Sequence, residues 1–185
     1  MEKITGKGDH TSVESLLDAF HEAARVSDKC EYFACFNSPE SRFLGTDAQE
    51  NWTVREFYDF AGPYFDKAKA EGKAAWEYTP IIGSRKVDIL GNIAYFDEIM
   101  TSVSFRATTR GNGVAIRNEE GRWSLLQYHL SFPIPNPLAH SFCAVIADWE
   151  TKEKENVGEG AGEDAEKALI DVLLKRRKES LSGRK

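Results

Sequence analysis

The segment Gly121-Arg122-Trp123-Ser124-Leu125-Leu126-Gln127-Tyr128-His129-Leu130-Ser131-Phe132-Pro133-Ile134-Pro135-Asn136 decides the fold class. Aromatic and aliphatic residues dominate its central part, residues 122–133, which is typical of a β-strand. Because side chains alternate faces along a strand, one face should carry Trp123, Leu125 and His129, and the other Leu126, Tyr128, Leu130 and Phe132. Both faces are apolar. We therefore expect one face to cover a cavity beneath helices of the same chain and the other to meet a second copy of the protein.

Three more strands are predicted upstream of this segment, where β-branched and aromatic residues recur between turn signals. Their ranges are residues 75–89, 92–108 and 113–118. The turns that separate successive strands are predicted at Leu90-Gly91-Asn92, Arg110-Gly111-Asn112-Gly113 and Asn118-Glu119-Glu120-Gly121. Strands this close in sequence pair antiparallel, so the sequence predicts a curled antiparallel meander.

Helices are predicted before the strands. The first has an amphipathic stripe of Val13, Leu16, Leu17, Phe20 and Ala24, with Thr11 and Glu14 as its capping box. A short second helix is expected around residues 32–36, followed by a turn-rich stretch at 41–47. A third helix should open at Thr53, with Glu56 completing a capping box, and Gly62-Pro63 should kink or split it. Helices followed by strands indicate an α+β layout.

The composition excludes some classes of protein. The chain has 185 residues, of which 41% are hydrophobic and 29% charged, and 24 Lys and Arg against 30 Asp and Glu give a net charge of −6. This acidic balance argues against broad nucleic-acid binding, which requires a basic face. The apolar runs are too short for a transmembrane helix, so no membrane partner is expected. The first ten residues lack the apolar core of a signal peptide, and we therefore expect a cytoplasmic protein.

Several of these segments together resemble a known family. They are the order of the bent helices, the Leu44-Gly45-Thr46-Asp47 loop followed by Trp52-Thr53, the Ala94-Tyr95-Phe96-Asp97-Glu98 strand, and the segment 121–136. The chain is similar to the SnoaL-like branch of the nuclear transport factor 2-like superfamily over residues 11–137. The resemblance implies a cone-shaped α+β barrel, in which a curved antiparallel sheet wraps on N-terminal helices around a pocket, and a homodimer through the outer face of the sheet.

The resemblance implies less about chemistry. The superfamily includes ketosteroid isomerase, polyketide cyclases, scytalone dehydratase and limonene epoxide hydrolase, and also the association domain of a calmodulin-dependent kinase. Fold therefore does not decide function here. We expect a pocket for a small hydrophobic organic ligand, with cofactor-free isomerase, cyclase, hydratase or hydrolase activity. The alternative is a non-catalytic module for ligand binding, dimerisation or scaffolding.

The candidate catalytic residues are Asp97, His129 and Tyr128. Acid–base enzymes of this fold use a carboxylate or a histidine in an apolar cavity and a tyrosine or a protonated acid that stabilises an enolate. Asp97 and Glu98 are neighbours on a strand, so one should point inward and the other outward. Asp97 could instead be neutralised by a cross-strand arginine such as Arg106 or Arg117, and His129 could be a packed sheet histidine. Which face lines the pocket stays open at this point.

The candidate ligand-binding residues are mostly aromatic. Trp52, Trp76 and Tyr78 are expected near the pocket mouth and on the first strand, and Tyr58 and Tyr64 could offer hydroxyl groups from the third helix. Leu126 and Leu130 would line the pocket if Tyr128 does. The histidines and cysteines lack the spacing of a metal site, and no phosphate-binding glycine loop is found, so neither metal nor cofactor is expected.

Residues 138–185 form a C-terminal extension outside the resemblance. An apolar stretch at 142–147 precedes a charged, glycine-rich linker at 150–164. Helical spacing resumes at 165–178, which predicts an amphipathic helix that could serve as a partner-binding arm. Its terminal Lys175-Arg176-Arg177-Lys178 complements the helix dipole, with a targeting signal as the alternative interpretation.

Overall fold

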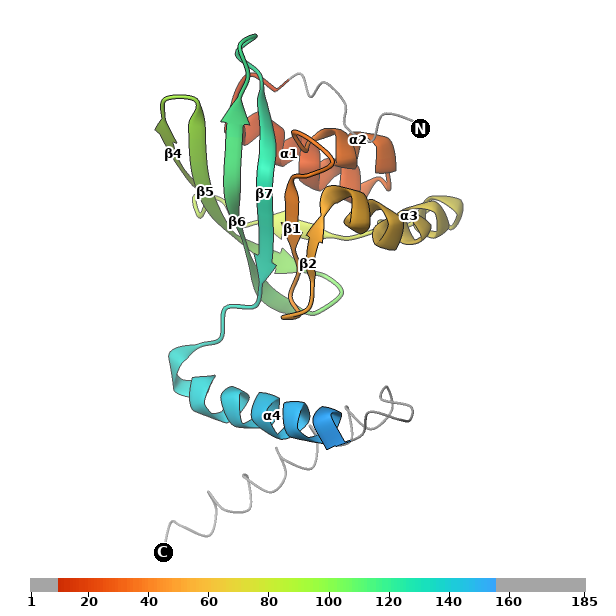
Figure 1. The fold of residues 1–185 in the computed structure, drawn as a ribbon, viewed down its shortest axis with the longest axis vertical. Coiled ribbons are helices and arrows are strands. Elements are labelled where there is room, and N and C mark those ends of the chain that lie inside the picture. Colours follow the sequence, from red (N-terminus) through yellow and green to blue (C-terminus); the bar gives the residue numbers. More distant parts are fainter. Residues whose placement is uncertain (1–9, 156–185) are drawn as a thin grey trace, which may run out of the picture. The chain divides into compact units, whose positions relative to one another are not determined.

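The computed structural model describes residues 10–155, in which helices pack against one face of a curved sheet (Figure 1). The chain divides after Pro133 into two compact units. The helices of the first unit are α1 (Val13–Arg25), α2 (Lys29–Ala34) and α3 (Val54–Ala70). Its strands are β1 (Arg42–Leu44), β2 (Asn51–Thr53), β3 (Tyr78–Pro80), β4 (Lys86–Leu90), β5 (Ile93–Ser102), β6 (Ala107–Arg117) and β7 (Trp123–Ser131). The second unit contains α4 (Asn136–Glu155).

The sheet has the order β2-β1-β7-β6-β5-β3, with β4 also paired to β5. Its pairs are antiparallel except for β1 and β7, which run parallel. The sequence predicted an antiparallel sheet and missed this pair, because β1 lies in the stretch interpreted as turns. A parallel pair needs a long crossover, which the chain between β1 and β7 supplies. The α+β class and the curved sheet on N-terminal helices are as predicted.

Two predicted strand boundaries are wrong. The strand predicted over 75–89 is two short strands, β3 and β4. The turn predicted at 110–113 lies inside β6, and the chain turns instead at 103–106, where Arg106 has a positive φ of 50°. The glycines inside β6 serve close packing. A Cβ on Gly111 would lie 2.1 Å from the Tyr128 hydroxyl oxygen, and one on Gly113 would lie 2.1 Å from the Gln127 carbonyl oxygen.

A β-bulge at Leu126 changes which face of the sheet the following side chains of β7 occupy. Ala115 pairs with Leu125 and Val114 pairs with Gln127, so Leu126 is an extra residue without an opposite partner. The buried residues are Trp123 and Leu125 before the bulge and Tyr128 and Leu130 after it. Regular alternation had put these two pairs on opposite faces, and that prediction is wrong because one extra residue reverses the facing of all that follow.

The helix caps follow the sequence closely. In α3, the Thr53 hydroxyl accepts from the Glu56 N–H at 3.3 Å, and a Glu56 carboxylate oxygen accepts from the Thr53 N–H at 2.7 Å. This capping box was predicted. The helix is not split, because it continues through Pro63. In α1, the capping box is formed by Ser12 and Ser15, one residue after the predicted Thr11 and Glu14.

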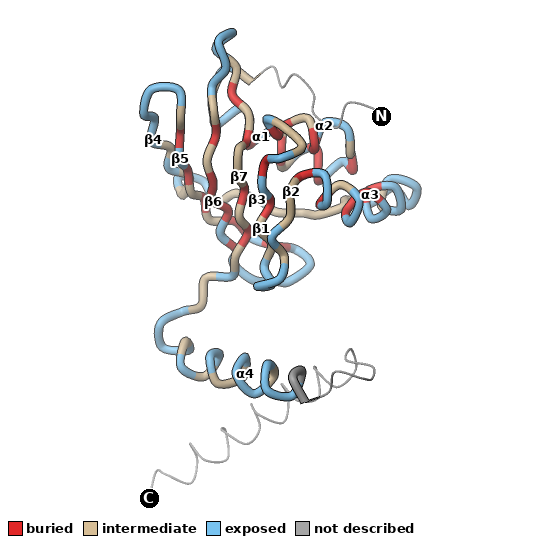
Figure 2. Tube along the Cα trace, in the orientation of Figure 1, coloured by how far each residue is buried: buried red, intermediate tan, exposed pale blue. Residues whose placement is uncertain are grey.

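The core lies between the helices and the inner face of the sheet (Figure 2). On β5 the inner, buried residues are Ala94, Phe96, Glu98 and Met100. Aromatic rings supply much of the helical side, and Phe20 stacks on Tyr32 with ring centroids 4.3 Å apart. Such offset and edge contacts between rings add to the energy of apolar burial. The helices are thereby held against the strands that carry the site.

The second unit, described by itself, has exposed apolar side chains. On α4, Leu138, Phe142 and Ile146 are exposed. The helix extends to Glu155, so the first part of the linker predicted at 150–164 is helical. The helix predicted at 165–178 and its basic end lie outside the described residues. Within residues 10–155, no helix is both long enough and apolar enough to span a bilayer.

Candidate functional site

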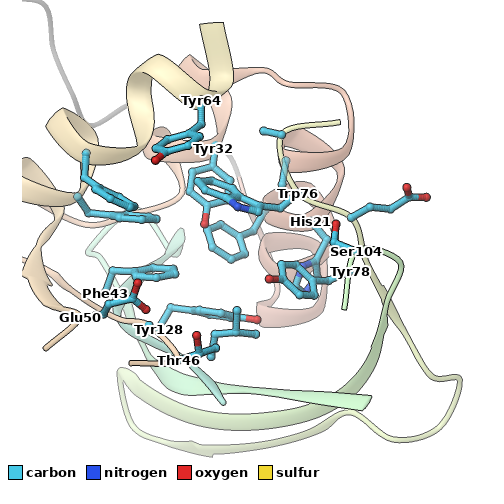
Figure 3. A pocket seen from close by; sticks show the side chains of 18 of the residues that line it. His21, Tyr32, Phe43, Thr46, Glu50, Tyr64, Trp76, Tyr78, Ser104 and Tyr128 are labelled. Carbon is cyan, nitrogen blue, oxygen red and sulfur yellow. The ribbon is translucent and has the colours of Figure 1, made fainter. Parts of the chain in front are cut away.

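A cavity of about 440 Å³ lies in the first unit, between the helices and the inner face of the sheet (Figure 3). Its walls are aromatic, with Phe43, Trp52, Phe57, Phe60, Tyr64 and Trp76. Its polar lining comprises His21, Thr46, Glu50, Glu77, Tyr78 and Ser104. Tyr128 and Leu130 line it from β7. The volume is within the range of pockets that hold small organic molecules.

One wall of the cavity is a set of nearly parallel rings. Phe43 stacks on Phe57 with centroids 3.8 Å apart and planes at 10°. Trp52 lies 5.5 Å from Phe57 at 14°, and Trp76 lies 6.0 Å from Phe57 at 19°. These rings come from β1, α3, β2 and the segment before β3, which the fold brings together around one helix. A flat apolar ligand could lie against such a wall with little desolvation cost.

The hairpin of β1 and β2 positions a polar group at the cavity. The Gly45 N–H donates to the Glu50 carbonyl oxygen at 2.8 Å, and the Asp47 N–H donates to Glu50 Oε2 at 3.1 Å. A Cβ on residue 45 would lie 2.8 Å from the Glu50 Cβ and would displace the Glu50 carboxylate from its present position. The loop therefore holds the Glu50 side chain against its own backbone.

His21 on α1 forms a short polar contact beside the cavity. Its Nε2 lies 2.5 Å from Oε1 of Glu98 on β5, and the Glu98 side chain is fully buried. A carboxylate oxygen accepts only, so Nε2 carries the shared proton. Among the described residues, Nδ1 of His21 has no hydrogen-bond partner. In the neutral ring, Nδ1 is thus the nitrogen with a free lone pair, oriented by a carboxylate on the other side.

Arg85 completes the pairing of Glu98. Its Nε donates to Glu98 Oε2 at 2.8 Å, and its Nη1 donates to Asp18 Oδ1 at 2.8 Å and to the Glu14 carbonyl oxygen at 3.2 Å. Arg85 precedes β4, whereas Asp18 and Glu14 are on α1. A buried carboxylate is costly unless both its oxygens are satisfied, and here each has a partner.

Glu98 is ionised in this setting. Burial is the largest single influence and would raise the pKa of Glu98. The hydrogen bond and charge of His21, together with the charge and hydrogen bond of Arg85, outweigh burial and hold the pKa of Glu98 below its usual value of 4.5. Glu98 can therefore stabilise a positive charge that develops on His21 when the ring accepts a proton.

Two tyrosines of the cavity, Tyr128 and Tyr78, keep their hydroxyl protons. Burial, followed by the negative charge of Glu98, raises the pKa of Tyr128 well above its usual value. Burial, followed by the charge of Glu50, raises the pKa of Tyr78 to about 12. The Tyr128 hydroxyl has only a long contact with Met100 Sδ, at 3.9 Å. Both hydroxyls are thus able to donate a hydrogen bond to a ligand oxygen.

Two of the predicted catalytic residues lie on the outer face of the sheet. Lys86, Asp97, Asn112 and His129 occupy paired positions on β4, β5, β6 and β7, and we call them the outer row. Alternation places Asp97 opposite to Glu98, and the bulge places His129 opposite to Tyr128. The cross-strand neighbours of Asp97 are Lys86 and Asn112, rather than an arginine. The catalytic roles of Asp97 and His129, and the homodimer through this face, stay predictions.

The predicted ligand-binding residues divide into two sets. Five of them line the cavity, namely Trp52, Tyr64, Trp76, Tyr78 and Leu130, and so does the predicted catalytic Tyr128. Tyr58 and Leu126 do not line it. The Tyr58 ring packs on Phe33 with centroids 4.8 Å apart and has Lys29 Nζ 5.5 Å from its centroid. Leu126 is the bulge residue of β7.

Sequence reasoning missed His21, Glu50 and Arg85 and did not choose Glu98. A signal existed for His21, which lies four residues after Leu17 and three before Ala24 and therefore shares the apolar face of α1. Glu98 was recognised as the alternative to Asp97. Arg85 carries no local signal, because its partners are on a distant helix. In residues 10–155, no group of three or more His, Cys, Asp or Glu side chains is arranged to hold a metal ion.

Comparison with known proteins gives a family and a fold. The family described as SnoaL-like domain matches residues 13–135. No curated protein is similar to the chain. A structure of a candidate ketosteroid isomerase from Shewanella frigidimarina is similar with a TM-score of 0.50 and 19% identity, covering 66% of this chain and 96% of the other. A candidate dehydratase of the nuclear transport factor 2-like family from Streptomyces avermitilis has a TM-score of 0.52 and 14% identity, covering 69% and 97%. At these identities the likeness is one of fold.

Proposed function

The chain belongs to the SnoaL-like domain family, and from that premise we propose that its cavity binds a small organic molecule and that His21 moves a proton on it. The observation that carries the proposal is the contact of 2.5 Å between His21 Nε2 and the buried Glu98, at the wall of a cavity of about 440 Å³. A histidine oriented by a carboxylate is a common general base. Around it, the aromatic walls exclude water from the reacting groups.

The roles of the side chains follow from their protonation. Nδ1 of His21 accepts a proton from a carbon next to a carbonyl group, and the ionised Glu98 stabilises the imidazolium that results. A protonated tyrosine, Tyr78 or Tyr128, donates a hydrogen bond to the carbonyl oxygen as negative charge develops there. Return of the proton to another carbon completes an isomerisation. Its transfer from His21 to a hydroxyl group on the next carbon, which leaves as water, completes a dehydration. These two reaction classes, for which the similar structures are named, are the ones to test first.

Arg85 and Asp18 are positioning residues in this proposal. Arg85 holds Glu98 Oε2 at 2.8 Å, which directs the other oxygen toward the histidine. It also neutralises part of the carboxylate charge. The alternative function is a module that binds a ligand without catalysis.

Exchange of carbon-bound hydrogen tests the proposal without knowledge of the substrate. Proton abstraction next to a carbonyl can be followed by NMR as deuterium incorporation into 2-tetralone in D₂O. We expect the protein to accelerate this exchange and His21→Gln to lose the acceleration, whereas His129→Gln, the matched control on the outer row, keeps it. A loss of about 100-fold or more is expected for removal of a general base.

The same measurement contains the outcome that contradicts the proposal. If His21→Gln folds with an unchanged circular dichroism spectrum and exchanges as fast as the wild type, His21 is not the base. Binding of 2-tetralone without any acceleration in the wild type would favour the non-catalytic module.

A further inference from the structure

The charged side chains that line the cavity are all of one sign. Glu50 and Glu77 line it, and the described lining includes no lysine or arginine. His21 is the remaining titratable group of the wall besides the tyrosines, and its Nε2 is bound to Glu98. Arg85 neutralises the charge of Glu98, so Arg85 and Glu98 together contribute little to the electrostatic potential in the cavity. Apart from His21, the charged side chains of the lining are therefore both negative.

Glu50 keeps one carboxylate oxygen available for a ligand. Glu50 Oε2 accepts from the Asp47 N–H at 3.1 Å, and Oε1 has no hydrogen-bond partner among the described residues. Within the same part of the chain, the Glu77 carboxylate takes part in no hydrogen bond or ion pair. The cation Arg25 is bound by Glu22, with Nη2 2.5 Å from Oε1, and it also interacts electrostatically with Glu77. Glu50 is therefore the carboxylate of the lining with the weaker compensation. Figure 3 shows Glu50 with Phe43 and Thr46 on one side of the cavity, and Tyr78 and His21 on the other.

The aromatic walls match the same ligand charge. A cation is attracted to the negative face of an aromatic ring, most strongly to tryptophan. Trp52, Trp76 and Tyr64 all line the cavity. An ammonium group with methyl or methylene substituents can contact these aromatic side chains while its charge is balanced by Glu50. A carboxylate ligand would instead meet like charge at Glu50.

We propose that the cavity selects an organic cation, an alkylammonium ion attached to a flat apolar body, with Glu50 as its principal counter-ion. This inference rests on the proposed function, because it takes the cavity as the ligand site. It adds the charge of the ligand, which neither the fold nor the proton-transfer chemistry specifies. Glu77 and the tryptophan faces supplement Glu50, and the parallel ring wall holds the apolar body.

Three probes that share a naphthalene ring test the charge. They are trimethyl(2-naphthylmethyl)ammonium, the neutral 2-(2-naphthyl)ethanol and the anion 2-naphthylacetate, titrated into the full-length protein by isothermal calorimetry. We expect the cation to bind about tenfold more tightly than the alcohol, and the anion to bind more weakly than both. Glu50→Gln should weaken the binding of the cation by about three- to tenfold and change the binding of the alcohol by less than about twofold. Glu119→Gln, in an exposed turn, is the matched control and should change neither.

A second pair of variants locates the binding. Ser104 is an exposed turn residue that lines the cavity, and its neighbour Val103 is exposed but does not line it. Ser104→Trp should block the mouth of the cavity and weaken the binding of both the cation and the alcohol. Val103→Trp should weaken the binding of neither. If the alcohol binds as tightly as the cation and Glu50→Gln leaves the affinity for the cation unchanged, the proposal of a cationic ligand is wrong. The proposal that the cavity binds a small organic molecule is then unaffected. If no probe binds, or if Ser104→Trp has no effect, the cavity is not the ligand site and both proposals fail.

Discussion

Asp97 and Glu98 are neighbours on β5 but have different surroundings. Glu98 is fully buried on the inner face, with a partner on each oxygen, His21 at 2.5 Å and Arg85 at 2.8 Å. Asp97 is half-buried on the outer face and belongs to the outer row with Lys86, Asn112 and His129. On each side of the sheet, the acid thus has a cationic side chain and a histidine in its surroundings. Burial and the pairing of both carboxylate oxygens, rather than residue type, distinguish Glu98 from Asp97, since electrostatic contacts strengthen where water is excluded.

The largest expected effect is the difference in stability between variants of Glu98 and variants of Asp97. Glu98→Ala leaves Arg85 and His21 beside a buried gap and removes the charge that compensates Arg85. We expect a loss of about 3 to 5 kcal/mol in the free energy of unfolding, measured by urea denaturation. Asp97→Ala, the matched control, should lose less than about 1 kcal/mol. Equal losses in the two variants would abolish the distinction between the faces.

The two histidines give the next largest difference. His21→Ala leaves Glu98 Oε1 without its partner, which should cost about 2 to 3 kcal/mol because the acceptor is charged and buried. His129→Ala removes a half-buried side chain of the outer row and should cost less than about 1 kcal/mol. Urea denaturation of both variants at the same pH measures the contrast. A larger loss for His129 would indicate that the outer row is the more tightly organised set.

A glycine on β6 tests the inner face through its shape. A Cβ at position 111 would collide with the Tyr128 hydroxyl, so Gly111→Ala should lose about 2 kcal/mol. The neighbouring Asn112→Ala, which faces outward, should lose less. Adding Tyr128→Phe to Gly111→Ala removes the closest colliding atom, and the double variant should therefore recover part of the loss. Strict additivity of the two substitutions would contradict this account of the glycine.

The smallest expected effect is on the pH dependence of stability. The folded-state pKa of Glu98 is below its usual value of 4.5, so its stabilisation is complete above the unfolded-state pKa and is lost as the pH falls through the folded-state pKa. In urea midpoints measured between about pH 6 and pH 3, the wild type should lose more stability than Glu98→Gln. Asp97→Asn should follow the wild type. A parallel decline of wild type and Glu98→Gln would show that Glu98 does not titrate below its usual range.

Local patterns predicted much of this fold. The stripe on α1 and the capping box of Thr53 and Glu56 placed two helices, and the aromatic residues 122–133 placed β7. Glycine was less informative. Gly111 and Gly113 predicted a turn, but they lie inside β6 because Tyr128 and the Gln127 carbonyl approach too closely for a side chain. A glycine required by packing and one required by a turn look alike in sequence.

The candidate site was predictable in part. Aromatic residues expected at the pocket, such as Trp52 and Trp76, do line it. The facing of β7 could not be predicted, because no residue type identifies a bulge. The pairing of His21 with Glu98 joins residues 77 positions apart, and no local signal connects them. Arg85 shows the same limit, since its partners on α1 and β5 are neighbours only in the folded chain.

The bulge at Leu126 divides β7 into two halves with separate supports. Before it, the Trp123 N–H donates to the His10 carbonyl oxygen and the Leu125 N–H to that of Cys35. After it, residues from Gln127 to His129 pair with β1. The first half anchors the start of the chain, and the second carries Tyr128 and Leu130 to the cavity. Substitutions can therefore remodel the cavity-facing half while the anchoring half stays unchanged, which makes this strand a natural place to re-engineer the lining of the cavity.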